Sequence, residues 1–176
     1  MKRTNIVLAA ACFAFACQAN ANNDGENVIY LGSGPAKSGS PTTTTSKSPF
    51  TLGYLRLANA RDVVWGFDIS GEGTMLDSTW GQNNAVKQAT SYNFLIGKNL
   101  GKTESSRFDL AFIAGIREKT SDCPSSYLGY QCYANSKPNT TNAFNYGAAL
   151  TWSYKGFMLG ARATGESTQA IVGLRF

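Results

Sequence analysis

The chain contains no histidine, the usual general base of hydrolases and proteases. Without histidine, two cysteines also cannot complete an ordinary structural zinc site. Chemistry by a Ser/Lys pair or by paired carboxylates stays formally open. Gly32-Ser33-Gly34 is followed by no helix pattern and no Lys-Ser/Thr, so it does not predict a phosphate-binding loop. We therefore expect no catalytic site, no metal and no cofactor.

Cysteine is also scarce, and the four cysteines fall into two groups. Cys12 and Cys17 lie near the N-terminus, in a segment that we expect to be removed. Cys123 and Cys132 lie together in a polar segment further along the chain. In an oxidising compartment an isolated pair of this kind predicts one disulfide that closes a loop.

Long apolar runs are missing, apart from one at the N-terminus that is too short for the ~20 residues of a membrane-spanning helix. The chain begins with the basic residues Lys2 and Arg3, residues 6–17 are mostly apolar, and residues 19–21 have the sequence A-x-A. These three parts predict a signal peptide that is cleaved after Ala21. A membrane anchor and a lipoprotein signal that ends at Cys17 are the alternatives.

No run of Lys or Arg occurs, although the formal net charge is +5. Two of the basic residues, Lys2 and Arg3, lie in the predicted signal peptide. The remaining excess is mild and spread along the chain, which argues against a dedicated nucleic-acid surface. Residues 22–176 have about the length of a single domain.

Alternation of apolar with small or polar residues is abundant. In residues 144–154, one face collects Phe, Tyr, Ala, Leu, Trp and Tyr, and the other collects Asn145, Gly147, Ala149, Thr151 and Ser153. This period of two is typical of a β-strand. We predict eight strands, at residues 27–33, 50–58, 63–69, 92–97, 108–116, 144–154, 157–164 and 168–176.

Short and long connections alternate between these strands. The short connections are residues 59–61, 99–106 and 154–156. The long connections are residues 35–49, 73–88 and 120–142, which are polar and rich in Ser, Thr, Asn and Gly. The last hairpin, at residues 165–167, is short and breaks the alternation. Otherwise the order predicts an all-β fold, an antiparallel up-and-down barrel with tight turns at one end.

The polar faces of the strands favour a transmembrane barrel over a soluble one. They hold mostly Gly, Ala, Ser, Thr and Asn, which suit the inside of a narrow barrel, so the bulky apolar residues would face lipid. Trp152 and Tyr154 end one strand, and Phe144 and Tyr146 begin it, as in two interfacial girdles. A β-sandwich with two aromatic core clusters is the alternative.

Chain length limits the number of strands. Sixteen membrane strands need roughly 160 residues before any loop is counted, whereas eight need about 80. A large single-chain porin is therefore excluded. The interior of an eight-stranded barrel is just filled by side chains, so we expect no wide aqueous channel.

With these strands and the ending Thr168-Gln169-Ala170-Ile171-Val172-Gly173-Leu174-Arg175-Phe176, the chain resembles the small outer-membrane β-barrel superfamily. That group includes the opacity-type adhesins and the transmembrane domain of OmpA-like proteins. Its last strand ends in an aromatic residue preceded by alternate apolar residues. The resemblance implies a place in the bacterial outer membrane, with lipid and the assembly machinery as partners. It also implies that Val172, Leu174 and Phe176 form the signal read by that machinery.

Charged residues in or beside the predicted strands suggest ion pairs inside the barrel, because a buried charge is tolerated only when it is paired. The expected acidic partners are Asp62, Asp68 and Glu72. The expected basic partners are Arg56, Arg117, Arg162 and Arg175.

Three tyrosines, Tyr127, Tyr130 and Tyr133, surround the second cysteine pair. On a closed loop they could form a contact surface for an external ligand, or they could simply pack against the end of the barrel. The pattern as a whole favours a structural and adhesin-like surface-interaction barrel. A narrow porin-like channel and a soluble periplasmic binding barrel are the alternatives.

Overall fold

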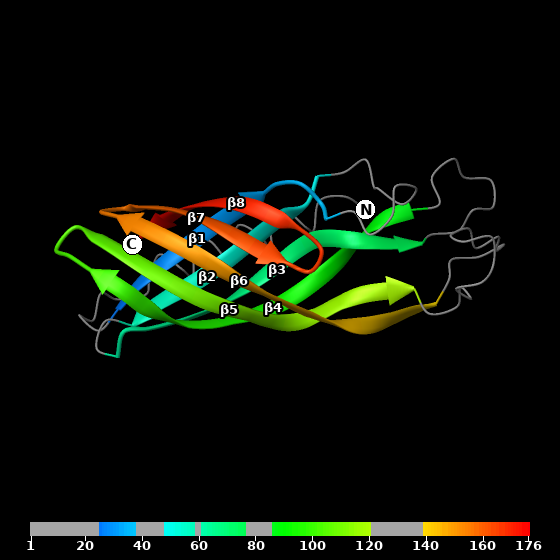
Figure 1. Cartoon of the computed structure of the whole chain (residues 1–176), viewed down its shortest axis with the longest axis horizontal. Helices are drawn as coiled ribbons and strands as arrows, with labels where there is room; N and C mark the ends of the chain where they lie inside the picture. The colour runs from blue at the N-terminus through cyan, green and yellow to red at the C-terminus, as the bar shows by residue number, and fades with distance from the viewer. Residues whose placement is uncertain (1–24, 38–47, 59–60, 77–85, 121–138) are drawn as a thin grey trace, which may run out of the picture.

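The computed structural model describes residues 25–37, 48–58, 61–76, 86–120 and 139–176, which form eight strands. In chain order they are β1 (Gly25–Ser33), β2 (Phe50–Ala58), β3 (Val63–Leu76), β4 (Val86–Lys102), β5 (Ser106–Thr120), β6 (Thr140–Tyr154), β7 (Phe157–Thr164) and β8 (Thr168–Arg175). Each strand pairs antiparallel with the next, and β8 pairs with β1, so the sheet closes into a barrel (Figure 1). The predicted fold class is confirmed. Within the described ranges, no helix is long and apolar enough to cross a membrane.

The barrel closes along β1 and β8, from Val28 opposite Arg175 to Ser33 opposite Ala170. Asn27 and Phe176 extend this seam by exchanging backbone hydrogen bonds of 2.8 and 2.9 Å. Where all eight strands pair, the closed sheet has no open edge, so the backbone groups there are paired within the chain.

The two ends of the barrel differ. We call one the turn end, where residues 61–62, 103–105 and 155–156 connect strands, and the opposite one the loop end. The turn end lies at the left in Figure 1, where β4 meets β5 and β6 meets β7. Tight turns thus occur at one end, as the sequence predicts.

The wall of the barrel is uneven in height. Strands β3 to β6 are 14 to 17 residues long, whereas β1, β2, β7 and β8 have only 8 or 9. Pairing between β5 and β6 continues to Thr120 and Thr140, but pairing between β6 and β7 stops at Gly147 and Thr164. Strands β3 to β6 are longer than predicted, because the added residues show no regular alternation between an apolar and a polar face.

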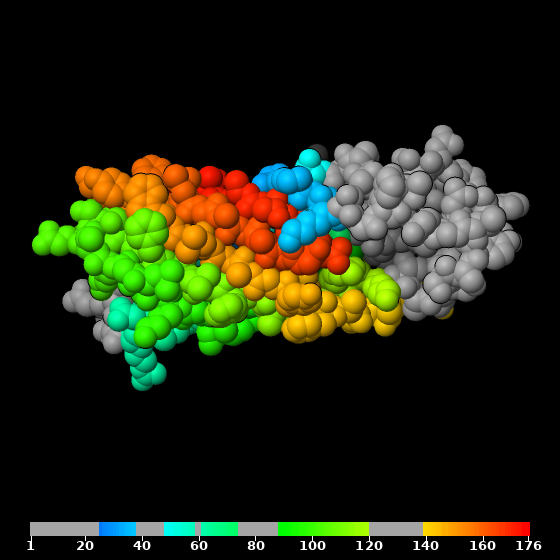
Figure 2. Space-filling model, in the orientation of Figure 1, coloured from blue at the N-terminus to red at the C-terminus, as the bar shows by residue number. Residues whose placement is uncertain are grey.

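The outer surface of the barrel is apolar and aromatic. In β6, Phe144, Tyr146, Leu150, Trp152 and Tyr154 are exposed, while Asn145, Ala149, Thr151 and Ser153 are buried. This assignment of the two faces agrees with the sequence prediction. Figure 2 shows one side of the outer wall, where β5, β6 and β7 lie.

The interior is layered along the barrel axis, with polar side chains toward the loop end and a buried ion pair near the turn end. An apolar layer lies between them, formed by Val28, Tyr30, Leu55, Leu57, Val64, Leu95, Ala111, Ile113, Ala149, Met158 and Ile171. The expectation of a mainly small and neutral interior is therefore wrong for this layer. Both faces of the strands are apolar there, so alternation does not reveal it.

Candidate functional site

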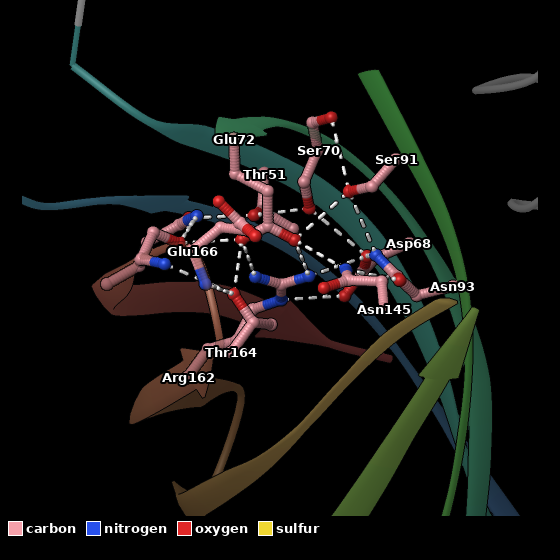
Figure 3. A network of polar contacts seen from close by, with 12 residues as sticks. Thr51, Asp68, Ser70, Glu72, Ser91, Asn93, Asn145, Arg162, Thr164 and Glu166 are labelled. Atoms are coloured by element: carbon pink, nitrogen blue, oxygen red, sulfur yellow. Dashed lines mark hydrogen bonds and ion pairs between the residues drawn. The ribbon is translucent and has the colours of Figure 1, made fainter. Parts of the chain in front are cut away.

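Arg162 of β7 is fully buried and contacts two carboxylates of β3 (Figure 3). Its Nε and Nη2 donate to Asp68 at 2.9 and 3.1 Å, and its Nη1 and Nη2 donate to Glu72 at 2.9 and 3.1 Å. Asp68 and Glu72 point inward together because residues two and four apart share a face of a strand. Strands β3 and β7 lie on opposite walls, so Arg162 links those walls through the interior.

Neutral side chains complete the coordination of Glu72. Oε1 accepts from Ser91 Oγ at 3.0 Å and Asn145 Nδ2 at 2.8 Å, and Oε2 accepts from Thr164 Oγ1 at 2.7 Å and Ser167 Oγ at 2.6 Å. These donors come from β4, β6, β7 and the β7–β8 turn. The Glu72 carboxylate therefore connects side chains from several strands of the barrel through hydrogen bonds.

Asp68 is bound in a similar way. It accepts from Tyr30 Oη at 3.0 Å, Ser70 Oγ at 3.1 Å and Asn93 Nδ2 at 2.6 Å. We call the connected set the polar network, formed by Tyr30, Thr51, Asp68, Ser70, Glu72, Ser91, Asn93, Asn145, Arg162, Thr164, Ser167 and Gln169. It contains one cation and two anions, and hydrogen bonds from neutral groups stabilise the second anion.

A glycine makes room for Tyr30. A Cβ atom at Gly53, directly across the β1–β2 pair, would lie 2.1 Å from the Tyr30 ring. Only a glycine fits this position without displacing the ring. The close approach lets Tyr30 lie across β2 and donate to Asp68.

The loop end carries a second set of contacts above the polar network. Glu166, between β7 and β8, forms a 2.7 Å ion pair with Arg117 of β5, which spans the intervening β6. Gly73 has a φ of 75°, and a Cβ there would lie 2.8 Å from Glu166 Oε2. Lys37 donates its backbone N–H to the Glu166 carbonyl and its Nζ to the Thr164 carbonyl. The short β7–β8 hairpin is thus fastened to the taller wall and to the segment that leaves β1.

The turn end holds an ion pair that sequence reasoning missed. Arg107 Nε and Asp109 Oδ1 lie 2.7 Å apart, and both residues are buried. Asn99 also donates to Asp109 at 3.0 Å. The available signal was the alternation itself, because two opposite charges flank the outward-facing Phe108 and therefore share the inward face of β5.

The structure brings together only part of the predicted charge set. Asp68 and Arg162 pair directly. Arg117 contacts Glu166, and Arg175 contacts Glu26 at 3.4 Å, so neither meets the acids expected for it.

Two predicted interior charges do not lie inside the barrel. Arg56 is on the outer side of β2, because Leu55 and Leu57 occupy the inward positions beside it. It donates to Asn27 Oδ1 at 2.8 Å instead. Asp62 is exposed in the β2–β3 turn, with a φ of 51°, because it precedes the first residue of β3.

The remaining site predictions stay predictions. Val172, Leu174 and Phe176 are exposed on the outer surface, and their role in assembly stays a prediction. The signal peptide at residues 1–21, the cysteine pair Cys123 and Cys132, and the tyrosines Tyr127, Tyr130 and Tyr133 all lie outside the described residues. In the part of the chain that the structure describes, no group of three or more His, Cys, Asp or Glu residues could hold a metal ion.

A search of protein-family models found no match, and a search of curated proteins found none either. Among solved structures, the barrel is similar to Ail, the attachment invasion locus protein of Yersinia pestis. A crystal structure of Ail is 16% identical with a TM-score of 0.48, and its complex with the heparin analogue sucrose octasulfate is 18% identical with a TM-score of 0.48. The backbone structure of Ail in a phospholipid bilayer nanodisc is 17% identical with a TM-score of 0.45. Each alignment covers 87% of this chain and 99% of the other. The fold assignment of this chain rests on its own strand pairing.

Proposed function

We propose that this protein is an exported outer-membrane barrel that acts as a rigid scaffold for surface-interaction loops. The observation that carries the proposal is the inverted distribution of side chains. Phe112 and Phe144 are 63% and 68% exposed on the outside, whereas Arg162, Asp68 and Glu72 are buried inside. A soluble barrel would place its charged residues outside in water and its apolar residues inside. The observed distribution fits a wall surrounded by lipid.

The aromatic residues of β6 support this location. Phe144 stacks on Tyr146 near the loop end, and Trp152 stacks on Tyr154 near the turn end. The strand rises about 33 Å between Phe144 and Tyr154. With a strand tilt of about 40°, that rise corresponds to about 25 Å along the barrel axis, the height of the apolar band in membrane barrels.

The polar network supports the scaffold role. It joins opposite walls in the loop-end half of the barrel, and the polar segments 38–47, 77–85 and 121–138 connect strands at that end. Rigid strand ends lower the entropic cost of presenting a binding loop. We propose that these segments meet the outside and that the tyrosines of residues 121–138 contribute to an adhesin-like contact.

The interior argues against the channel alternative. The apolar layer that includes Leu55, Leu95 and Ile113 fills the described barrel below the polar network. A solute would have to pass this layer and the buried ion pairs of Arg162 and Arg107. The scaffold function is therefore favoured over transport.

The location can be tested with epitope tags in the full chain, expressed in a Gram-negative host. One tag is inserted after Ser125 and a matched tag after Gly156 in the β6–β7 turn. We expect heat-modifiable protein in the outer-membrane fraction, with the first tag labelled on intact cells and the second labelled only after permeabilisation. Recovery in the soluble fraction, or the reverse labelling, would overturn the proposal.

A separate experiment tests whether the loop tyrosines contribute to surface binding. Cells that display the wild type or the Tyr127→Ser/Tyr130→Ser/Tyr133→Ser variant at equal surface levels are compared for binding to an epithelial monolayer. We expect several-fold weaker binding of the variant, because tyrosines are prominent among energetically dominant interface residues. Equal binding would rule out these tyrosines as the contact surface.

A further inference from the structure

Four basic residues surround the outer wall at the turn end: Arg56, Arg61, Lys98 and Lys155. We infer that they form a basic collar that binds the phosphate groups of anionic phospholipids in the leaflet around the turn end. This inference rests on the proposed membrane location and adds a specific lipid class to it.

The register places the collar residues at the edge of the apolar outer surface. Arg56 lies two residues before the end of β2, and Arg61 lies in the β2–β3 turn. Lys98 lies opposite Val63, the first residue of β3, and Lys155 lies in the β6–β7 turn. The last three are exposed, and Arg56 is half-buried. Three collar residues thus lie on neighbouring elements from β2 to β4, and the fourth lies in the β6–β7 turn.

The neighbouring side chains suit a headgroup layer. Arg56 lies across from Trp65, and Lys155 Nζ is 5.4 Å from the centre of the Tyr154 ring. Basic side chains at such positions lay their aliphatic stems on apolar surface and extend their charge to the interface. Trp and Tyr occupy the same depth in membrane proteins.

Arg56 is also held in place. Its Nη1 donates to Asn27 Oδ1 at 2.8 Å, and the Tyr54 hydroxyl donates to the same oxygen at 2.7 Å. In the described contacts this bond uses one of the several N–H donors of the guanidinium. Because Arg56 is half-buried on the outer side of β2, its other donors are available to a phosphate in the paired geometry that arginine favours.

Positive charge exceeds negative charge at the turn end. Lys102, at the tip of the β4–β5 hairpin, adds a fifth cation, and the exposed acids of the described turn end are Asp62 and Glu104. Two other acids there, Glu26 and Asp109, are paired with Arg175 and Arg107. The net field at this end therefore attracts anions.

The spacing of the cations favours lipid over a free anion. A small anion needs several donors at one point, whereas the collar residues belong to different strands and turns around the barrel. A ring of lipid surrounds the whole perimeter and can contact each of them separately. One Lys or Arg near an anionic surface is worth about a fivefold change in binding.

The inference can be tested on the full mature chain refolded into phosphatidylcholine vesicles. Electron spin resonance measures how strongly the protein retains spin-labelled phosphatidylglycerol relative to spin-labelled phosphatidylcholine. We expect the wild type to prefer phosphatidylglycerol, with a preference that falls as salt is added. The variant Arg61→Gln/Lys98→Gln/Lys155→Gln should lose most of it. Arg56 is left unchanged because its substitution would also remove the contact with Asn27.

Two control variants show whether the position and the sign of the charge matter. The variant Lys47→Gln/Lys119→Gln/Lys137→Gln removes the same charge elsewhere in the chain and should retain the preference. The variant Asp62→Asn/Glu104→Gln removes turn-end acids and should increase it. If the collar variant inserts normally and keeps the wild-type preference, the inference is overturned while the membrane barrel stands. If the wild type does not become heat-modifiable in vesicles, the proposed function itself fails.

Discussion

Arg162 and Asp68 form a doubly hydrogen-bonded ion pair between β7 and β3, two strands that face each other across the barrel and do not pair through their backbones. In a soluble fold, the burial of apolar surface would hold such opposite walls together. A barrel wall in contact with lipid gains little from burying apolar surface, because the surrounding hydrocarbon is as apolar as the side chains. The polar network therefore carries a large share of the cohesion in the loop-end half.

We predict that Arg162→Met strongly destabilises the barrel. The substitution leaves Asp68 and Glu72 buried without their cation, which costs about 3–5 kcal/mol. Urea unfolding in detergent micelles, followed by tryptophan fluorescence, measures this loss. The matched control is Arg61→Met, an exposed position, where we expect a change within about 0.5 kcal/mol. Equal midpoints for the two variants would show that the ion pairs do not support the barrel.

Gly53→Ala should also destabilise the barrel, through Tyr30. The added methyl group would collide with the Tyr30 ring and move its hydroxyl away from Asp68, at a cost of about 1–3 kcal/mol. Gly101→Ala is the matched control, because a Cβ there meets nothing within 4 Å. The same micelle unfolding experiment compares them. A Gly53→Ala variant as stable as Gly101→Ala would contradict the role of this close approach.

Deletion of Phe176 should reduce assembly in cells. It removes the two backbone hydrogen bonds with Asn27 and an outward-facing apolar side chain at the closing seam. We expect much less heat-modifiable protein in the membrane fraction than after deletion of Ser125. The yield of folded protein after refolding in detergent, without the assembly machinery, should fall less. Unchanged assembly in cells would exclude the C-terminal strand as an assembly signal.

Cys123 and Cys132 should be linked in protein taken from the cell envelope. They are the only two cysteines outside the predicted signal peptide, and an oxidising compartment favours their pairing. Mass spectrometry of non-reduced peptides would detect the link, with reduced protein as the control. Complete alkylation of both thiols without prior reduction would disprove it.

Purified protein should produce no reproducible unitary current steps in planar bilayers. The apolar layer and the three buried ion pairs fill the described interior, so we expect no hydrated path for ions. The Arg162→Met variant serves as a comparison in which one of these barriers is weakened. Regular steps from the wild type would favour the narrow channel.

The architecture was predictable because alternation identifies a strand whenever its two faces differ. Strand β6, with Tyr146 and Trp152 on one face and Asn145 and Thr151 on the other, is the clearest case. Alternation is less informative where both faces are apolar, as around Leu55, because no contrast shows which side is inward. The sequence therefore does not show that Arg56 lies on the outer face of β2.

The candidate site was only partly predictable for a different reason. Sequence places Asp68 and Arg162 on inward faces, but it does not say which opposite walls meet at which height. That relation depends on the stagger between strands, which the register fixes only once the barrel closes. Arg117 therefore pairs with Glu166 of the β7–β8 hairpin and not with an acid of β3. The Arg107–Asp109 pair is different, because both residues lie on β5 and alternation alone places them on the same face.

The seam between β1 and β8 has a consequence for the order of folding. Every other strand pair joins neighbours in the chain and can form as a local hairpin, but this pair joins residues such as Val28 and Arg175. Contacts between residues so distant in sequence are slow to form. Until they form, the sheet has two free edges that other chains can join. Ring closure is thus the step at which a folding chain either becomes protected or aggregates.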